Sequence, residues 1–275
     1  MLDQSQVDAF HRDGFLNAGP LLTDAECEVL RDEVLRVIDD RDREDLPQAV
    51  LTRDLNLGGR PVWQIVDIWK ASEPYERLLH HPVLTAMAGQ LAGAARELRI
   101  WHDQLQYKPA ETGGPTGWHQ DSPLWASLQP KTAQFSAWIA LDNAQVDNGC
   151  MSMVPGSHKW GVAISDLTAM MSEINKQNLS FFDLPETYQD HPVEVRHCPV
   201  KMGHVHFHHA LTWHGSHLNA SGRPRRAIAI HFMTEETVYS GDAGHPMAQF
   251  IEVEEGQKIV GDAFPLLWTA EVVTV

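Results

Sequence analysis

The sequence predicts a mainly β fold with flanking helices, a double-stranded β-helix (jelly roll) with an N-terminal helical layer. Residues 1–95 carry apolar side chains at helical spacing, whereas from residue 96 short apolar runs alternate with turns rich in glycine, proline and asparagine. The chain has 275 residues, of which 43% are hydrophobic, so we expect a single domain with a sizeable core.

Residues 1–95 are expected to be mostly helical. Residues 4–12 form a short amphipathic segment. A capping box at Thr23 and Glu26 opens a longer helix, whose apolar side chains recur at helical spacing at Val29, Leu30, Val34, Val37 and Ile38. Residues 74–93 are expected to form two helices, because Pro82 interrupts the pattern.

Residues 96–235 are expected to form the jelly-roll core. The predicted strands are residues 98–108, 133–141, 151–154, 193–197, 205–208 and 227–233. A helical insertion at residues 167–178 and a loop at residues 178–191 interrupt them, and such insertions are natural lids over a substrate site. Residues 236–275 follow as a C-terminal extension.

His119 and Asp121 are the first candidate metal ligands. They are two residues apart, so on an extended strand both side chains leave the same face. A loop rich in glycine and proline, residues 108–117, leads directly into them. An imidazole from His214 would complete a set of two histidines and one carboxylate, which leaves coordination positions open, as iron(II) oxygenases require.

A second candidate metal site is the histidine-rich segment at residues 204–209. His204, His206 and His208 alternate, so they share one face of a strand, and three imidazoles without a carboxylate would suit zinc. The alternative is that this strand is partly structural and delivers His214 to the site. The spacing is compatible with both interpretations.

Four motifs occur in a specific order and spacing. They are His119-Gln-Asp121, Ala137-Trp-Ile-Ala-Leu-Asp142, the segment from Asn148 to His158, and His214-Gly-Ser216 followed by Asn219, Ser221 and Arg225. With these motifs the chain resembles the phytanoyl-CoA dioxygenase family of iron(II)- and 2-oxoglutarate-dependent oxygenases, from the N-terminal helical region to about residue 233. The resemblance implies a cupin-like jelly roll, iron(II) bound by His119, Asp121 and His214, and 2-oxoglutarate and O2 as cosubstrates.

The resemblance also implies a pocket for 2-oxoglutarate. Arg225 would hold the distal carboxylate, since a guanidinium meets a carboxylate with two parallel hydrogen bonds. Ser216 would add a hydroxyl group to the same carboxylate, and Trp138 would form an aromatic wall. Gln106 is a candidate for a further contact, because it lies on the strand before the loop.

The reaction implied is oxidation of an unactivated C–H bond, with release of succinate and CO2. Related halogenases have a small residue where this chain has Asp121, so hydroxylation or another oxidation is favoured over halogenation. The expected substrate is a small organic molecule, with a secondary metabolite favoured over an amino-acid-like solute or an acyl thioester. Candidate substrate contacts are Trp125, Gln104 and Met153.

Composition restricts the partners and the compartment. A net charge of −16 argues against nucleic acid as a partner. No apolar run is long enough to cross a membrane and no signal peptide is apparent, so no membrane partner is expected. The 3 cysteines have no metal-binding or redox spacing, which favours a reducing cytoplasm.

Two other functions are compatible with parts of the pattern. One is a cupin-like metal enzyme, a hydrolase or isomerase, that does not use 2-oxoglutarate, although Arg225 and Ser216 speak against it. The other is a family member that binds a small molecule without turnover. The presence of all the predicted metal-ligating residues argues against it. The sequence leaves the oligomeric state open.

Overall fold

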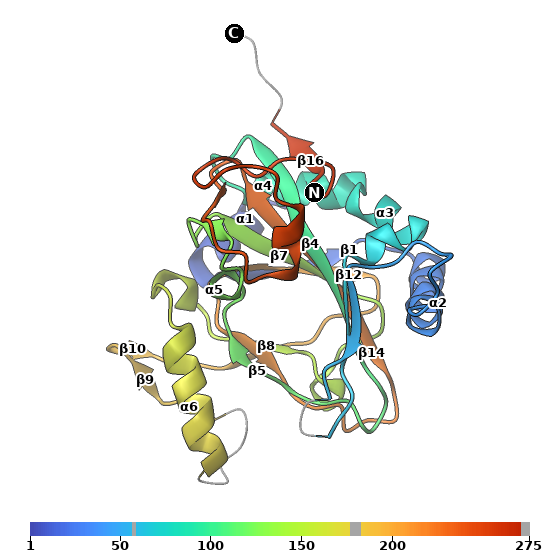
Figure 1. Cartoon of the computed structure of the whole chain (residues 1–275). Helices are drawn as coiled ribbons and strands as arrows, with labels where there is room; N and C mark the ends of the chain where they lie inside the picture. The colour runs from blue at the N-terminus through green and yellow to red at the C-terminus, as the bar shows by residue number, and fades with distance from the viewer. Residues whose placement is uncertain (57–58, 177–182, 271–275) are drawn as a thin grey trace.

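The computed structural model describes residues 1–56, 59–176 and 183–270 (Figure 1). Its larger sheet is antiparallel and has the strand order β1-β12-β7-β14-β4-β3-β2, with β16 pairing with β4 beyond the end of β3. These strands are β1 (Phe15–Pro20), β2 (Leu51–Asp54), β3 (Trp63–Val66), β4 (Glu97–Lys108), β7 (Gln134–Ala140), β12 (His204–His209), β14 (Arg225–Thr234) and β16 (Leu266–Thr269).

The smaller sheet is also antiparallel, with the order β11-β8-β13-β5. Its strands are β5 (Thr116–His119), β8 (Met151–Met153), β11 (Arg196–Cys198) and β13 (His214–Ser216). Two short ribbons complete the strands, β6 (Leu128–Gln129) with β15 (Val238–Tyr239) and β9 (Thr187–Tyr188) with β10 (His191–Pro192). Two antiparallel sheets that enclose a pocket are the arrangement of a jelly roll, so the predicted fold class is confirmed.

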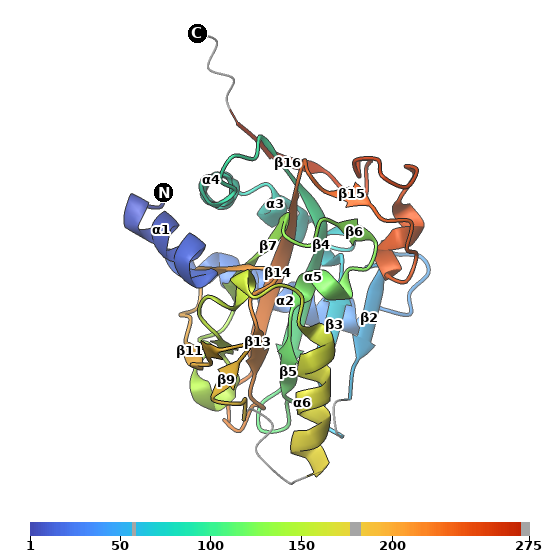
Figure 2. The same ribbon diagram turned by 90° about the vertical axis from the view of Figure 1, so that its left-hand side faces the viewer.

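The N-terminal helices cover the face of the larger sheet that points away from the smaller sheet (Figure 2). They are α1 (Gln4–Asp13), α2 (Asp24–Asp39), α3 (Glu73–Leu79) and α4 (Pro82–Leu91). The predicted capping box is present at the start of α2, where Thr23 and Glu26 exchange side-chain and backbone hydrogen bonds. The main core joins these helices to β4, β7, β12 and β14.

The alternation of β14 divides the molecule into a core side and a pocket side. Ile228, Ile230 and Phe232 are fully buried in the main core under the helices. Arg225 and His231, which have the opposite parity, line the pocket between the sheets. Successive side chains of a strand point to opposite faces, so this one strand supplies both the packing and the site.

Several predicted elements differ from the structure in their extent. The first 95 residues also contain β1, β2 and β3, and the C-terminal extension adds β16 to the larger sheet. The strand expected at residues 193–197 lies at Arg196–Cys198. The predicted insertion corresponds to α6 (Ile164–Lys176), and its last residues, with the first part of the loop expected at 178–191, lie outside the described residues. The rest of that loop contains β9 and the start of β10.

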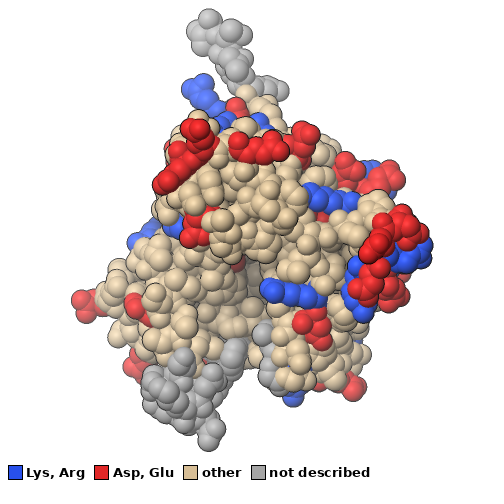
Figure 3. Space-filling model, in the orientation of Figure 1, with Lys and Arg blue, Asp and Glu red and all other residues tan. Residues whose placement is uncertain are grey.

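The surface agrees with the acidic composition. Figure 3 shows acidic side chains at the top and the right-hand edge of the molecule, beside a broad face that is mostly uncharged. Among the helices of the described residues, none combines the length and apolar character that a membrane span requires.

Candidate metal centre and cosubstrate pocket

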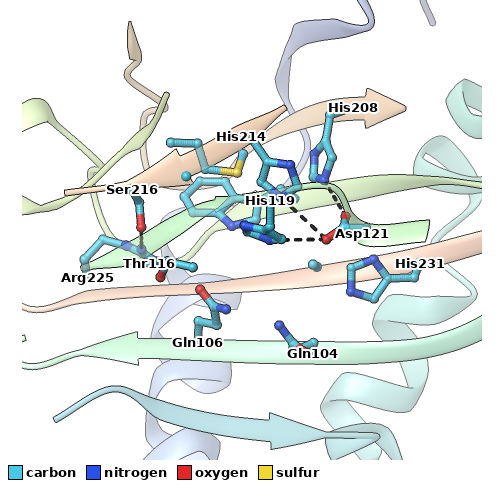
Figure 4. Close-up of a pocket in the computed structure, with 14 residues that line it drawn as sticks. Gln104, Gln106, Thr116, His119, Asp121, His208, His214, Ser216, Arg225 and His231 are labelled. Atoms are coloured by element: carbon cyan, nitrogen blue, oxygen red, sulfur yellow. Dashed lines mark hydrogen bonds and ion pairs between the residues drawn. The ribbon is translucent and has the colours of Figure 1, made fainter. Parts of the chain in front are cut away.

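A pocket lies between the two sheets and collects residues from distant parts of the chain (Figure 4). Most of the residues singled out from the sequence line it, namely Gln104, Gln106, His119, Asp121, Trp138, His214, Ser216 and Arg225. The rest of the lining consists of Thr116, Met151, His208, Gly215, Ala229 and His231. The antiparallel pairing of β13 with β5 explains part of this, because it sets His214 directly opposite His119.

His119, Asp121 and His214 form the one group of metal-ligating side chains found among the described residues, with potential ligand atoms all within 4.8 Å of one another. His119 ends β5, and His214 begins β13. Asp121 was expected on an extended strand with His119, but it begins the short helix α5 (Asp121–Leu124). This turn of the chain directs its carboxylate towards both imidazoles (Figure 4).

The two imidazoles are held in the tautomer that a metal site needs. Nδ1 of His119 lies 2.8 Å from the carbonyl oxygen of Gly117, and Nδ1 of His214 lies 2.9 Å from that of Thr212. A carbonyl oxygen only accepts, so each Nδ1 carries a proton, and Nε2 is the ring nitrogen that faces Asp121 and could bind a metal ion. Both Nε2 atoms lie 3.5 Å from Oδ1 of Asp121, a separation that a cation between them would bridge. The donor set therefore fits a divalent metal ion.

The second oxygen of Asp121 is bound by the protein. Oδ2 accepts hydrogen bonds from Nε2 of His208 at 3.1 Å and from Oγ of Ser136 at 3.3 Å. Burial alone would raise the pKa of Asp121, but the charge of His214 and the hydrogen bonds from the surrounding histidines hold the pKa well below its usual value. Asp121 is thus held as a carboxylate, with its other oxygen, Oδ1, directed at His119 and His214.

The histidine-rich strand β12 does not form a separate metal cluster within the described part of the chain. His206 is fully buried and stacks on Phe15, with ring centroids 5.8 Å apart. His208 instead contacts Asp121 and lines the pocket. The zinc alternative for this segment is therefore not supported, and β12 has a supporting position beside the candidate metal site.

Arg225 lies at the other end of the pocket from Asp121 (Figure 4) and is 1% exposed. Its Nε donates to the carbonyl oxygen of Gly149 at 3.1 Å, and its Nη2 lies 3.4 Å from Oγ of Ser216. The third nitrogen, Nη1, is buried without a hydrogen-bond partner in the described structure. Burial lowers the pKa of Arg225 to about 10, which still leaves the guanidinium charged at neutral pH.

A buried guanidinium with an unsatisfied donor is costly unless an anion completes it. The ring of Trp138 lies 5.5 Å from Cζ of Arg225 and forms a wall of this end of the pocket. With Ser216 adjacent, the arrangement matches the shape and charge of a carboxylate. The residues present therefore fit 2-oxoglutarate, a molecule with a metal-chelating end and a distal carboxylate.

Gln104 and Gln106 line the pocket from β4, as their shared face predicts. Oε1 of Gln104 accepts a hydrogen bond of 2.8 Å from Nε2 of Gln64, and Oε1 of Gln64 in turn accepts from Arg53. Because arginine only donates, this series leaves the amide nitrogen of Gln104 free to donate into the pocket.

Two candidate substrate contacts do not reach the lining of the pocket. Trp125 is 4% exposed and packs in a core cluster behind His231, with ring centroids 4.7 Å apart. Met153 is fully buried beside His214. Met151, two residues earlier on the same face of β8, lines the pocket instead, because the antiparallel register places it next to Ser216.

Two histidines of the pocket, His208 and His231, were not predicted to lie there. His231 follows Arg225 by an even number of residues on β14, so the period of a strand could have placed it on the pocket side. Its Nδ1 lies 2.7 Å from Oγ of Ser136. His208 belonged to the segment considered for zinc, and no sequence signal linked it to Asp121.

Comparison with known proteins identifies the family. The family model described as phytanoyl-CoA dioxygenase (PhyH) matches residues 10–227. A phytanoyl-CoA dioxygenase domain-containing protein 1 homolog from Caenorhabditis briggsae is 32% identical over 150 residues, which are 54% of this chain and 51% of that protein. The matched region thus spans about half the length of the nematode protein. An ectoine dioxygenase from Bordetella parapertussis is 27% identical over 245 residues, which are 86% of this chain and 76% of that protein.

The fold has close counterparts among solved structures. The non-haem α-ketoglutarate-dependent epimerase SnoN from nogalamycin biosynthesis superimposes with a TM-score of 0.70 at 23% identity, covering 96% of this chain and 97% of that one. The family's enzymes depend on iron(II), 2-oxoglutarate and O2, and the pocket fits the first two of these. The chain therefore belongs to the phytanoyl-CoA dioxygenase family and is a non-haem iron(II)- and 2-oxoglutarate-dependent dioxygenase.

Proposed function

We propose that His119, Asp121 and His214 hold iron(II), and that Arg225 and Ser216 hold the distal carboxylate of 2-oxoglutarate. The main support for this proposal is that one pocket contains both a group of metal-ligating atoms and a buried guanidinium nitrogen without a hydrogen-bond partner in the described part of the chain. At one side, Nε2 of His119 and Nε2 of His214 each lie 3.5 Å from Oδ1 of Asp121, too far for a good hydrogen bond but a separation that a cation would bridge. At the other, Nη1 of Arg225 is buried without a partner among the described residues.

Iron(II), 2-oxoglutarate and O2 together supply the oxidising power, and 2-oxoglutarate is converted to succinate and CO2. The protein supplies position and exclusion of water. Arg225 and Ser216 fix the distal end of 2-oxoglutarate, which directs its keto-acid end at the two histidines. Trp138 and Met151 provide apolar walls. Asp121 occupies one ligand position and leaves no room there for a halide, so the outcome that we propose is hydroxylation or another oxidation of a C–H bond.

We propose a small organic substrate, and within that class a secondary metabolite. Gln104 and His231 lie on the same pocket and offer polar contacts to a substrate oxygen. The net charge of −16 disfavours a polyanionic coenzyme A ester. The names within the family point to different substrates, since one refers to a coenzyme A ester and another to ectoine.

The compartment that we propose is the cytoplasm, without nucleic acid as a partner. Cys27, Cys150 and Cys198 are all buried and free, as expected where thiols stay reduced.

The test is to supply the iron-loaded chain with 2-oxoglutarate and air, and to measure succinate while a panel of candidate substrates is added. A true substrate increases succinate formation and yields a product 16 mass units heavier for hydroxylation, about the mass of one oxygen atom. Asp121→Ala should abolish substrate-dependent succinate formation. Retained turnover in this variant would contradict the ligand assignment.

A further inference from the structure

Lys108 is a fully buried lysine that the activity described above does not explain. It ends β4, and its aliphatic stem passes close to two glycines. A Cβ atom at Gly113 would lie 2.7 Å from Cβ of Lys108, and one at Gly149 would lie 3.4 Å from its Cδ. Lysine is almost never fully buried without a partner. Gly113 approaches Lys108 too closely to carry a side chain of its own, so the loop after β4 packs directly against the lysine.

The ammonium group of Lys108 is surrounded by hydrogen-bond acceptors from β13 and the residue after it. Nζ lies 2.6 Å from Oγ of Ser216, 2.7 Å from the carbonyl oxygen of His217 and 3.5 Å from the carbonyl oxygen of Ser216. These three acceptors match the three donors of an ammonium group.

Lys108 and Arg225 are neighbours that lack a carboxylate partner. They are paired across β4 and β14, and in the described residues neither forms an ion pair with an aspartate or glutamate. Burial, followed by the charge of Arg225, lowers the pKa of Lys108 well below its usual value. This shift disfavours the charged form of Lys108, whereas a carboxylate bound beside Arg225 would favour the charged form and offset the cost of burying it.

The contact with Lys108 also determines the direction of the hydroxyl group of Ser216. An ammonium group only donates, so Oγ of Ser216 accepts from Lys108. Nη2 of Arg225 is likewise a donor towards the same oxygen. The hydroxyl hydrogen of Ser216 is therefore left to point elsewhere, and Ser216 lines the pocket.

We propose that Lys108 is a positioning residue for the cosubstrate, which acts through Ser216 and adds a second positive charge behind Arg225. Its effect is to select 2-oxo acids that carry a distal carboxylate. This inference rests on the proposed function, because it assumes that the pocket binds 2-oxoglutarate. It differs from a purely structural role, in which Lys108 would only fasten β4 to β13.

The test compares two ligands that share the metal-chelating end. One is 2-oxoglutarate, and the other is 2-oxopentanoate, which has the same carbon chain but ends in a methyl group. Binding to the iron(II)-loaded chain without oxygen is followed by the visible charge-transfer band. The variants are Lys108→Met, Lys108→Gln and the control Lys131→Met. Lys131 also donates to two backbone carbonyls, those of Trp125 and Leu128, but its hydrogen bonds do not involve Ser216.

In Lys108→Met the Kd for 2-oxoglutarate should rise at least about tenfold, because a nearby buried charge is lost. The Kd for 2-oxopentanoate should stay within about twofold, since that ligand has no distal charge. Lys108→Gln should also lose the preference for 2-oxoglutarate over 2-oxopentanoate. This variant provides the test if Lys108→Met does not fold. The control Lys131→Met should keep the preference for 2-oxoglutarate.

Equal changes for both ligands, or an unchanged preference, would overturn the inference and leave Lys108 as a structural link. Failure of the proposed function itself would be seen in the unaltered chain. If 2-oxoglutarate produces no band there, the proposed function fails, and the inference fails with it.

Discussion

Nε2 of His208 lies 3.1 Å from Oδ2 of Asp121, on the side of the carboxylate that faces away from His119 and His214. This hydrogen bond holds the carboxylate so that Oδ1 alone faces the proposed metal position between the two histidines. Groups that orient a metal ligand from behind contribute to affinity even though they do not touch the metal. The arrangement leads to the first prediction.

His208→Phe should weaken binding of iron(II) by about 10- to 100-fold, because Asp121 loses a donor that fixes its orientation. Titration calorimetry with the metal measures this without turnover. His208→Gln, which keeps a donor, should lose less. His204→Gln is the control on the same strand. Unchanged affinity in His208→Phe would show that Asp121 is oriented without this contact.

Arg225→Lys should raise the concentration of 2-oxoglutarate needed for half-maximal rate by about tenfold or more, because lysine lacks the planar fork that meets a carboxylate with two bonds. The maximal rate should recover largely at saturating 2-oxoglutarate. Arg226→Lys is a matched control, since Arg226 pairs instead with Asp142 at 2.8 Å. If both variants have the same requirement for 2-oxoglutarate, Arg225 does not hold it.

Phe232→Ala should lower the free energy of unfolding by about 3–5 kcal/mol, because it removes a fully buried ring from the main core. Leu266→Ala, at a side chain that is 41% exposed, should cost less than about 1 kcal/mol. Urea unfolding followed by circular dichroism measures both. A small effect at Phe232 would contradict the assignment of the core face of β14.

Burial, followed by the charge of His158, lowers the pKa of His209 to about 4. Its Nδ1 accepts a hydrogen bond of 3.1 Å from the backbone N–H of Leu211, a contact that a protonated ring cannot make. The unfolded chain binds this proton at about pH 6.5, so stability is complete above that pH and declines as the pH falls towards 4.

Urea unfolding at several pH values tests this linkage. The free energy of unfolding should fall between about pH 6.5 and 5, with His209 contributing up to about 1.4 kcal/mol per pH unit. His209→Asn keeps an acceptor but does not titrate, so its decline should be shallower. Equal slopes for the variant and the unaltered chain would mean that His209 is already charged in the fold.

The long elements of this fold could be predicted because their patterns are local. The capping box at Thr23 and the apolar run of the strand at residues 227–233 act through neighbouring residues, and both were confirmed. The short strands β1, β2 and β3 were missed, since they carry only 4 to 6 residues and are defined by pairing with distant partners.

The candidate site shows the same division. The motifs predicted which side chains would meet, but not the supporting contacts around them. His208 reaches Asp121 only because β12 pairs with β7 in the larger sheet, which no local pattern encodes. Trp125 was expected at the pocket from its closeness to Asp121 in sequence. The turn of α5 instead directs it into the core behind His231.

The most direct test adds iron(II) and then 2-oxoglutarate to the metal-free chain in the absence of oxygen. A visible metal-to-ligand charge-transfer band should form only after both additions, and it should be lost in His214→Ala. If no band forms while zinc binds tightly at the same residues, the assignment of iron and 2-oxoglutarate to this pocket is contradicted.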